Sequence, residues 1–283
     1  MVPFHFLMGL ILVSSTFIVI SSCRWVSMWV AFEINTLSFI PLIKSKGAAK
    51  YLLAQSLGSA LILCGAALSQ EVFVVSGAIV KAGVAPFHVW LPQVIEHLSW
   101  GLCLVISTWQ KIRPMVVVFS CFGGYYLYFF IVCRLLLGAI GAIKQARLRR
   151  ILAYSSITHI GWILSGLFVR VSVALVYFLA YCIISFFVIT KLSARNSYSR
   201  GIKDLSLVLV LFSIRGLPPF LGFFPKIWVF LGSSFLVCVP LIVSSVIITF
   251  VYTSIIFSRL QKAKRILTRG SVFSIFFISA LFL

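Results

Sequence analysis

Acidic residues are nearly missing from this chain, which has 24 lysines and arginines but only four acids, Glu33, Glu71, Glu96 and Asp204. Charged residues make up 10% of its 283 residues and hydrophobic residues 62%, against about 25% and about 45–50% in an average soluble domain. A soluble fold of this composition would lack polar side chains to cover its surface, and a disordered chain would leave too much apolar surface unburied. The composition therefore predicts a polytopic membrane protein with no room for a folded soluble domain.

Motifs for metals and nucleotides are also missing. The seven cysteines form no C-x-x-C pair and no cluster, which argues against zinc or iron–sulfur ligands and against a disulfide framework. The chain contains no G-x-G-x-x-G and no G-x-x-x-x-G-K-[ST]. A net charge of +20 would indicate nucleic acid as the partner of a soluble protein, but basic loops on the inner side of a membrane explain it here. We therefore expect no metal site and no nucleic-acid partner.

Long apolar runs separated by short loops predict an all-α protein with about eleven transmembrane helices, because one helical span needs about 20 apolar residues. Helices are favoured over a β-barrel since the runs are long and do not alternate in polarity. The first run begins at Pro3 with no basic residue ahead of it and no cleavage pattern, so we expect a retained span and not a secretory signal. The predicted spans are 3–22, 26–43, 51–69, 72–85, 99–121, 125–143, 151–169, 172–190, 205–231, 238–257 and 266–283.

Basic residues are distributed unevenly between the two sets of loops that these spans create. Sixteen lie in loops on the N-terminal side and two in loops on the other side. Because positive residues gather on the inner side of a membrane, the N-terminus is predicted on the positive-inside face and the C-terminus on the opposite face. A wrong span count would destroy this asymmetry. The sixteen lie within 44–50, 144–150, 191–203 and 259–269, and the two are Arg24 and Arg170.

Seven charged residues lie inside the predicted spans or at their ends. A charge at the bilayer centre costs about 2.5–3.5 kcal/mol on insertion scales, so each needs a partner, a cavity or a function. Three arginines lie near span ends, where a long side chain can reach the interface, and we favour that interpretation for them. Glu33 is too short to do so and the lysines lie beside helix-breaking residues, so we favour a functional role for these four. The arginines are Arg113, Arg134 and Arg215, and the lysines are Lys81, Lys111 and Lys226.

Two segments rich in proline and glycine interrupt the helical pattern, at 81–92 and at 215–226. Ordinary proline kinks are one interpretation. The breaks fall in the fourth and ninth predicted spans, however, so each can be the fourth helix of a five-helix unit, the second unit being inverted in the membrane. Paired broken helices in inverted repeats are typical of transporters, with ion sites near the midplane. The breaking prolines are Pro86, Pro92, Pro218, Pro219 and Pro225.

This pattern divides the chain into a first repeat at 3–121, a second repeat at 123–260 and a C-terminal helix at 266–283. Within the second repeat, His159 lies among hydroxyl groups that include Ser155 and Thr158, and His88 follows the first break. A neutral imidazole bonded to a hydroxyl or carbonyl is one interpretation of His159, and a proton relay is the other.

Five motifs occur in an order that resembles chain 2 of mitochondrial NADH–ubiquinone oxidoreductase, respiratory complex I. The resemblance runs from about residue 29 to 228, and the part beyond about residue 232 matches only in character, so the chain looks shorter than the family. Animal members lack the first three helices of the bacterial antiporter-like homologues, which agrees with the eleven predicted spans. The motifs are Phe-Glu33-Ile-Asn-Thr-Leu-Ser-Phe-Ile-Pro, Lys81-Ala-Gly-Val-Ala-Pro-Phe-His-Val-Trp-Leu-Pro, Thr-Trp-Gln-Lys111, Arg-Arg-Ile-Leu-Ala-Tyr-Ser-Ser-Ile-Thr-His159-Ile-Gly-Trp and Gly-Leu-Pro-Pro-Phe-Leu-Gly-Phe-Phe-Pro-Lys226.

The resemblance implies an antiporter-like subunit of the membrane arm, in which electron transfer to quinone elsewhere in the complex drives proton movement. By motif match, the proton-transfer sites are Glu33, Lys81, Lys111 and Lys226, with His159 in a supporting place. Arg215 departs from the family, which usually has glycine there. We expect Glu33 and Lys81 to be direct or one-water partners. Because Pro114 removes a helical donor, we also expect the carbonyl of Gln110 to accept a bond from water or from Lys111.

The resemblance also implies that the chain carries no cofactor, because FMN, iron–sulfur clusters and ubiquinone belong to other subunits. Its partners would be other membrane-arm subunits, neighbouring antiporter-like chains among them, and phospholipids such as cardiolipin. Its place would be the mitochondrial inner membrane, with the N-terminus in the matrix and the C-terminus in the intermembrane space. A stand-alone secondary cation/proton antiporter and a purely structural subunit are the alternatives.

Overall fold

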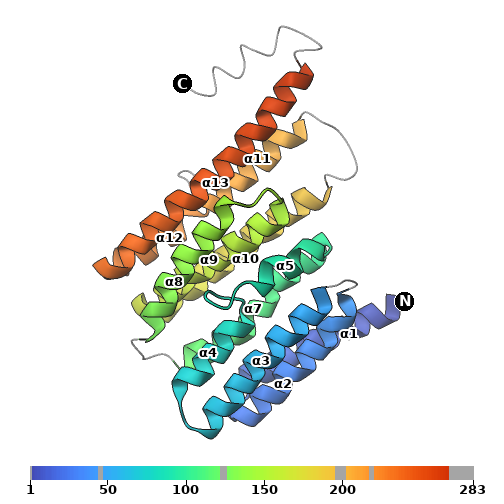
Figure 1. Cartoon of the computed structure of the whole chain (residues 1–283), viewed down its shortest axis with the longest axis vertical. Coiled ribbons are helices and arrows are strands. Elements are labelled where there is room, and N and C mark those ends of the chain that lie inside the picture. The colour runs from blue at the N-terminus through green and yellow to red at the C-terminus, as the bar shows by residue number, and fades with distance from the viewer. Residues whose placement is uncertain (1, 44–46, 122–125, 195–201, 217–219, 268–283) are drawn as a thin grey trace.

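The computed structural model describes residues 2–43, 47–121, 126–194, 202–216 and 220–267, and every regular element in these ranges is a helix (Figure 1). This confirms the all-α prediction. The first half contains α1 (Val2–Ser21), α2 (Trp25–Phe39), the 3-10 turn η1 (Ile40–Leu42), α3 (Gly47–Ala67), α4 (Glu71–Lys81), α5 (Trp90–His97), α6 (Trp100–Ser107) and α7 (Trp109–Ser120). The second half contains α8 (Tyr126–Ile143), α9 (Leu148–Val169), α10 (Val171–Ala194), α11 (Ile202–Arg215), α12 (Phe223–Gly232) and α13 (Phe235–Leu267).

Seven helical stretches in the described residues are long and apolar enough to cross a membrane, which supports a polytopic membrane protein. Two shorter apolar helices, Leu127–Ile143 and Phe223–Gly232, accompany them. Helix α13 continues to Leu267, beyond the predicted span end at 257. Most of the predicted span at 266–283 lies outside the described residues.

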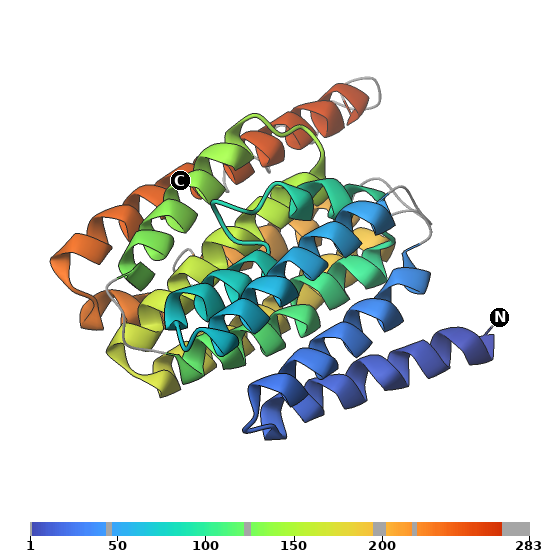
Figure 2. The same ribbon diagram turned by 60° about the horizontal axis from the view of Figure 1, so that its bottom comes forward.

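The helices lie side by side in an elongated bundle, with α1 and α2 at one end and α13 towards the other (Figures 1 and 2). Helix α9 lies at its centre, because 83% of its span is buried inside the chain, against 22% for α1. It contacts α5 and α6 from the first half and α8, α10, α12 and α13 from the second. Groups on α9 can therefore meet groups from both halves of the sequence.

The first interruption separates α4 from α5. Helix α4 ends at Lys81, and Gly83 has a φ of +67°, a left-handed conformation that glycine adopts without a Cβ penalty. Pro86 lies in the non-helical stretch that follows. Pro92 lies in the first turn of α5, where a missing amide hydrogen costs no helical hydrogen bond. The chain therefore resumes a helix soon after the break.

The second interruption separates α11 from α12. Gly216 follows α11 with a φ of +66°, and a Cβ added there would meet the carbonyl of Gly222. Pro225 lies in the first turn of α12. Pro218 and Pro219 lie outside the described residues.

A third interruption was missed by the sequence analysis. The predicted span 99–121 is present as the apolar stretch Trp100–Ser120, but it is interrupted at Thr108, whose φ and ψ are −119° and −71°, and so divides into α6 and α7. The amide of Lys111 donates to the Thr108 carbonyl at 3.2 Å, and the helical partner expected one turn earlier, the Ser107 carbonyl, is left for another donor. The Thr108 hydroxyl donates to the Leu104 carbonyl at 2.7 Å, a local bond that competes with helical pairing.

Candidate functional site

Lys81 is the last residue of α4 and is 4% exposed. Its Nζ donates to the Gln55 backbone carbonyl on α3 at 3.0 Å, and the Gln55 side-chain amide donates back to the Lys81 carbonyl at 3.1 Å. The Nζ also lies 4.8 Å from the centre of the Phe32 ring on α2. Lys81 is thus a buried amine held by carbonyl and aromatic groups.

Glu33 lies next to Phe32 on α2 and is half-buried. Among the described residues, ion pairs within 4.0 Å join only Glu96 to Arg147 and Arg150, so Glu33 and Lys81, which were expected to be direct or one-water partners, are not direct ones. The ammonium donates to the Gln55 carbonyl on α3 instead. A contact through one water stays a prediction.

Lys111 lies in the first turn of α7 and is 2% exposed. Its Nζ donates to the Ser156 carbonyl on α9 at 3.1 Å and lies 5.4 Å from the centre of the Tyr181 ring on α10. Of the two donors expected at the Gln110 carbonyl, water or this ammonium, the ammonium is bound elsewhere and water stays a prediction. The break at Thr108 turns Lys111 towards α9, and this break has no proline signal.

Lys226 lies on α12 and is half-buried. Its Nζ donates to the Arg215 carbonyl, which ends α11, and lies 5.5 Å from the centre of the Trp162 ring on α9. Each of the three internal lysines thus donates to a backbone carbonyl, which lies within α3, on the central helix α9 and at the end of α11 for Lys81, Lys111 and Lys226 in turn. In the described part of the chain, none of them is paired with a carboxylate.

His159 connects the surroundings of Lys111 and Lys226. It is 8% exposed on α9, and its Nδ1 shares a hydrogen bond of 3.0 Å with the Tyr177 hydroxyl. Its ring centre lies 5.1 Å from that of Tyr181, which faces Lys111. Tyr177 in turn stacks on Trp162 at 6.2 Å, and Trp162 faces Lys226.

Of the other predicted residues, Ser155 and Thr158 lie near His159, and His88 does not. Ser155 accepts a bond from the Tyr252 hydroxyl at 2.9 Å, and Thr158 donates to the Ser155 carbonyl at 2.8 Å. His88 lies apart from the lysines, because its Nδ1 contacts the Pro86 carbonyl at 3.2 Å and its ring meets Tyr154. The structure thus brings Ser155 and Thr158 close to His159 on one helix and leaves His88 at the first break.

The three internal arginines are buried inside the chain, at 2%, 1% and 2% exposure for Arg113, Arg134 and Arg215. The interpretation that they reach the membrane interface is therefore wrong. Arg113 donates to the Gln110 side chain and faces Phe32 with its Cζ 5.5 Å from the ring centre, and Arg215 lies over Phe212 and Tyr252. Sequence distance from a span end did not reveal that these side chains point inward.

Sequence reasoning also missed the polar partners of the lysines. Four polar side chains lie around the internal lysines and His159, yet each belongs to an apolar run of the sequence. They are Gln55, Tyr177, Tyr181 and Tyr252. A signal was present on α10, where Tyr177, Tyr181 and Ser185 recur every four residues and so share one helix face.

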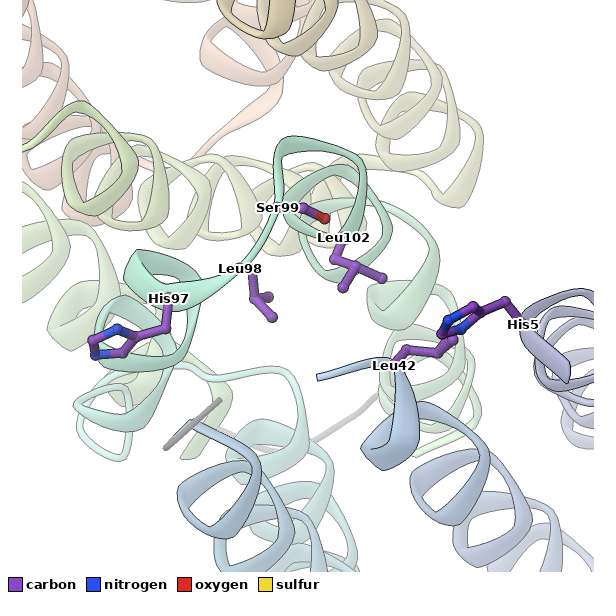
Figure 3. A pocket seen from close by; sticks show the side chains of 6 residues that line it. All are labelled: His5, Leu42, His97, Leu98, Ser99 and Leu102. Atoms are coloured by element: carbon purple, nitrogen blue, oxygen red, sulfur yellow. The ribbon is translucent and has the colours of Figure 1, made fainter. Parts of the chain in front are cut away.

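A separate pocket of about 400 Å³ is lined by residues of α1, η1, α5 and α6, and none of the internal lysines is in its lining. Figure 3 shows His5 of α1 and His97 of α5 on opposite sides of it, with Leu98 and Leu102 between them. In the described residues, no group of three or more His, Cys, Asp or Glu side chains is placed to hold a metal ion.

The family described as NADH:quinone oxidoreductase/Mrp antiporter, TM, matches residues 66–258. The class of protein is therefore a transmembrane subunit of antiporter type. NADH-ubiquinone oxidoreductase chain 2 of Lumbricus terrestris is 35% identical over 282 residues, which cover 87% of this chain and 84% of that relative. The chain belongs to the family of NADH-ubiquinone oxidoreductase chain 2.

Solved structures agree in fold. A chain of respiratory complex I from Thermus thermophilus with bound aureothin matches with a TM-score of 0.81 at 23% identity, over 88% of this chain and 69% of that one. A chain of the Mrp complex from Dietzia matches with a TM-score of 0.78 at 17% identity, over 86% of this chain and 58% of that one. At these identities the likeness concerns the fold.

Proposed function

We propose that this antiporter-like, proton-translocating membrane subunit of NADH:ubiquinone oxidoreductase moves protons along Glu33, Lys81, Lys111 and Lys226. One observation carries the proposal: three internal amines each donate to a backbone carbonyl, those of Gln55, Ser156 and Arg215. A carbonyl accepts a hydrogen bond from an amine or an ammonium alike, so a proton can leave without stranding a buried anion.

The four sites are electrostatically coupled, so that a change of charge at one alters the proton affinity of the next. Moving one charge across the membrane costs about 2.3 kcal/mol per 100 mV, which quinone reduction elsewhere in the complex supplies. We place His159 between Lys111 and Lys226 as a relay, supported by its bond to Tyr177 and its contact with Tyr181. Ser155 and Thr158 orient this region, and we give His88 only a supporting part at the first break.

We further propose that the chain has eleven spans in two inverted five-helix repeats, 3–121 and 123–260, and a C-terminal helix at 266–283. Repeated contacts between helices support this. In each half the first helix contacts the second, the second contacts the third, and the third contacts both parts of the broken fourth. The first helix also contacts the fifth in each half, as α1 with α7 and α8 with α13.

The chain is part of an NADH:quinone oxidoreductase and a multi-pass protein of the mitochondrial inner membrane. We propose that FMN, the iron–sulfur clusters and ubiquinone are bound by other subunits and that neighbouring antiporter-like chains flank this one. Apolar side chains exposed on α1, α10 and α13, together with the basic loops, favour contact with phospholipids such as cardiolipin. We place the N-terminus in the matrix and the C-terminus in the intermembrane space.

The central lysine offers a direct test. Lys111→Met, made at the matching lysine of a bacterial homologue, replaces the amine by an apolar chain of similar length, so assembly should stay near normal. Proton pumping driven by NADH oxidation should fall at least about tenfold, because one of the four proposed sites can no longer bind a proton. The matched control is Lys144→Met, which alters an exposed lysine between α8 and α9. Full pumping in the assembled Lys111→Met complex contradicts the relay role.

A stand-alone cation/proton antiporter is the alternative function, since it would use the same internal charges. Blue-native electrophoresis of solubilised membranes separates the two. A subunit migrates with a complex many times larger than this chain, and a lone carrier does not.

A further inference from the structure

Two small cavities have the Tyr181 side chain of α10 in their walls. The first has a volume of about 20 Å³ and the second of about 10 Å³. A cavity needs about 10–15 Å³ of this kind to hold one water, so each is close to the size of a single water molecule. Tyr181 and Ile214 are common to both linings, and of these two only tyrosine has a polar group.

The first cavity lies towards the break beside Lys111. It is lined by the serines at 107, 155 and 185. The Ser185 hydroxyl is buried and, in the described part of the chain, makes no hydrogen bond of ordinary geometry, although the Tyr181 hydroxyl lies near it. A buried hydroxyl of this kind is satisfied by water where the space allows it. The chemistry of this cavity therefore favours one water.

The second cavity lies towards Lys226. It is lined by His159 and Tyr177 on one side and by Gly222 and Pro225, at the second helix break, on the other. A water here would lie between the proposed relay histidine and the helix that carries Lys226. Tyr181 thus belongs to the walls of both cavities and its ring lies next to both Lys111 and His159.

The Tyr181 hydroxyl is fixed by the helix break at Thr108. It donates to the Ser107 carbonyl at 3.1 Å, and that carbonyl is available because the Lys111 amide donates to Thr108 instead. Lys111 itself lies over the Tyr181 ring. One side chain is therefore in contact with the break, with the central lysine and with both cavities.

We propose that Tyr181 is a positioning residue that separates the two cavities and so gates proton passage between Lys111 and His159. With its hydroxyl bound to Ser107, the ring divides the path. A movement of α6 against α7 at Thr108 lengthens that bond, lets the ring turn and joins the two waters into one chain. The proposal rests on the proposed function, because it concerns passage between two of its sites.

The test uses the full chain in its assembled complex, in native membranes, with two substitutions. Tyr181→Phe keeps the ring and removes the hydroxyl. One ordinary hydrogen bond changes the ratio of open to closed states by about fivefold, so protons translocated per NADH should fall measurably. Tyr181→Ala removes the ring and joins the cavities, so the passive proton leak should rise and NADH oxidation should no longer respond to an uncoupler. The control is Tyr128→Phe, on a half-buried tyrosine of α8 that packs against Phe168.

In both Tyr181 variants, the rate of NADH oxidation with an uncoupler should equal that of the control, and so should assembly on native gels. A merely structural defect would lower both. Wild-type proton ratio and leak in assembled Tyr181→Phe overturn the proposal, even if Tyr181→Ala fails to assemble, because Phe preserves the packing. If Lys111→Met loses pumping while both Tyr181 variants pump and leak as the wild type does, the gating role of Tyr181 is rejected and the proposed function stands. Full pumping in Lys111→Met removes the proposed function itself.

Discussion

At the scale of single residues, the absence of side chains matters as much as their presence. Gly58 on α3 faces Lys81, and a Cβ added there would lie 2.6 Å from Lys81 Cγ and 2.9 Å from the Gly77 carbonyl. Small residues allow membrane helices to approach closely, and α3 and α4 use this approach at Gly58 and Gly77. The lysine stem therefore occupies the space that a side chain at position 58 would need.

Gly58→Ala should displace Lys81 or separate α3 from α4, because the Gly77 carbonyl is backbone and cannot rotate away. Overpacking of this kind costs about 1–3 kcal/mol. We expect a lower temperature of inactivation and fewer protons translocated per NADH. Gly101→Ala on α6 is the matched control, since a Cβ there meets nothing within 4 Å. Equal thermal stability and pumping in the two variants would show that Gly58 makes no room for Lys81.

At the scale of helices, the sequence predicts interruptions only where proline or glycine is present. The breaks around Pro86 and Gly216 have that signal, whereas the break at Thr108 arises from a local hydroxyl bond and from long-range contacts of Lys111 and Tyr181. The burial of Arg113 could not be predicted either. The position of a residue in an apolar run indicates its depth in the membrane, but not whether its side chain points into the protein or outward. Recurring polar residues on α10 were the one pattern that periodicity could have revealed.

A second feature at this scale joins the two halves of the chain. Glu96 at the end of α5 is 9% exposed and forms ion pairs with Arg147 and Arg150, next to α9. The Arg149 guanidinium donates to the Glu96 carbonyl at 3.1 Å. The helix that follows the first break is thus bound by three arginines at the start of α9, with Arg147 just before it and Arg149 and Arg150 in its first turn.

Glu96→Gln should loosen this loop from α5, since it leaves two arginines side by side without an anion. Both arginines are partly in water, with side-chain exposures of 69% and 39%, so we expect a loss of only about 1 kcal/mol. Trypsin should then cut the loop at Arg147, Arg149 and Arg150 faster than in the parent chain. Glu71→Gln, an exposed acid at the start of α4, should leave the cleavage rate unchanged. The same rate in both variants would exclude a role of the ion pairs in holding the loop.

At the scale of the whole molecule, the net charge of +20 has two parts with different physics. The internal amines and guanidinium groups are enclosed by protein and are few. Most of the charge lies in the basic set on one side of the predicted spans, which favours contact with the membrane surface. Among the described residues of that set, Arg147 and Arg150 also pair with an acid of the chain, Glu96. The internal charges thus relate to the proposed function, and the charges at the loops relate to the orientation in the membrane. The net charge alone does not distinguish the two groups.

The orientation leads to a prediction about proteolysis. The loop 144–150 between α8 and α9 belongs to the basic set, and Arg24 between α1 and α2 belongs to the other set. If the basic loops face the matrix, trypsin added to inside-out inner-membrane vesicles should cut at Arg147–Arg150 and leave Arg24 intact. In vesicles of the opposite orientation, Arg24 should be the accessible site and the loop should be protected. Cleavage of the loop only from the intermembrane side would reverse the topology and, with it, the side from which protons reach Lys81.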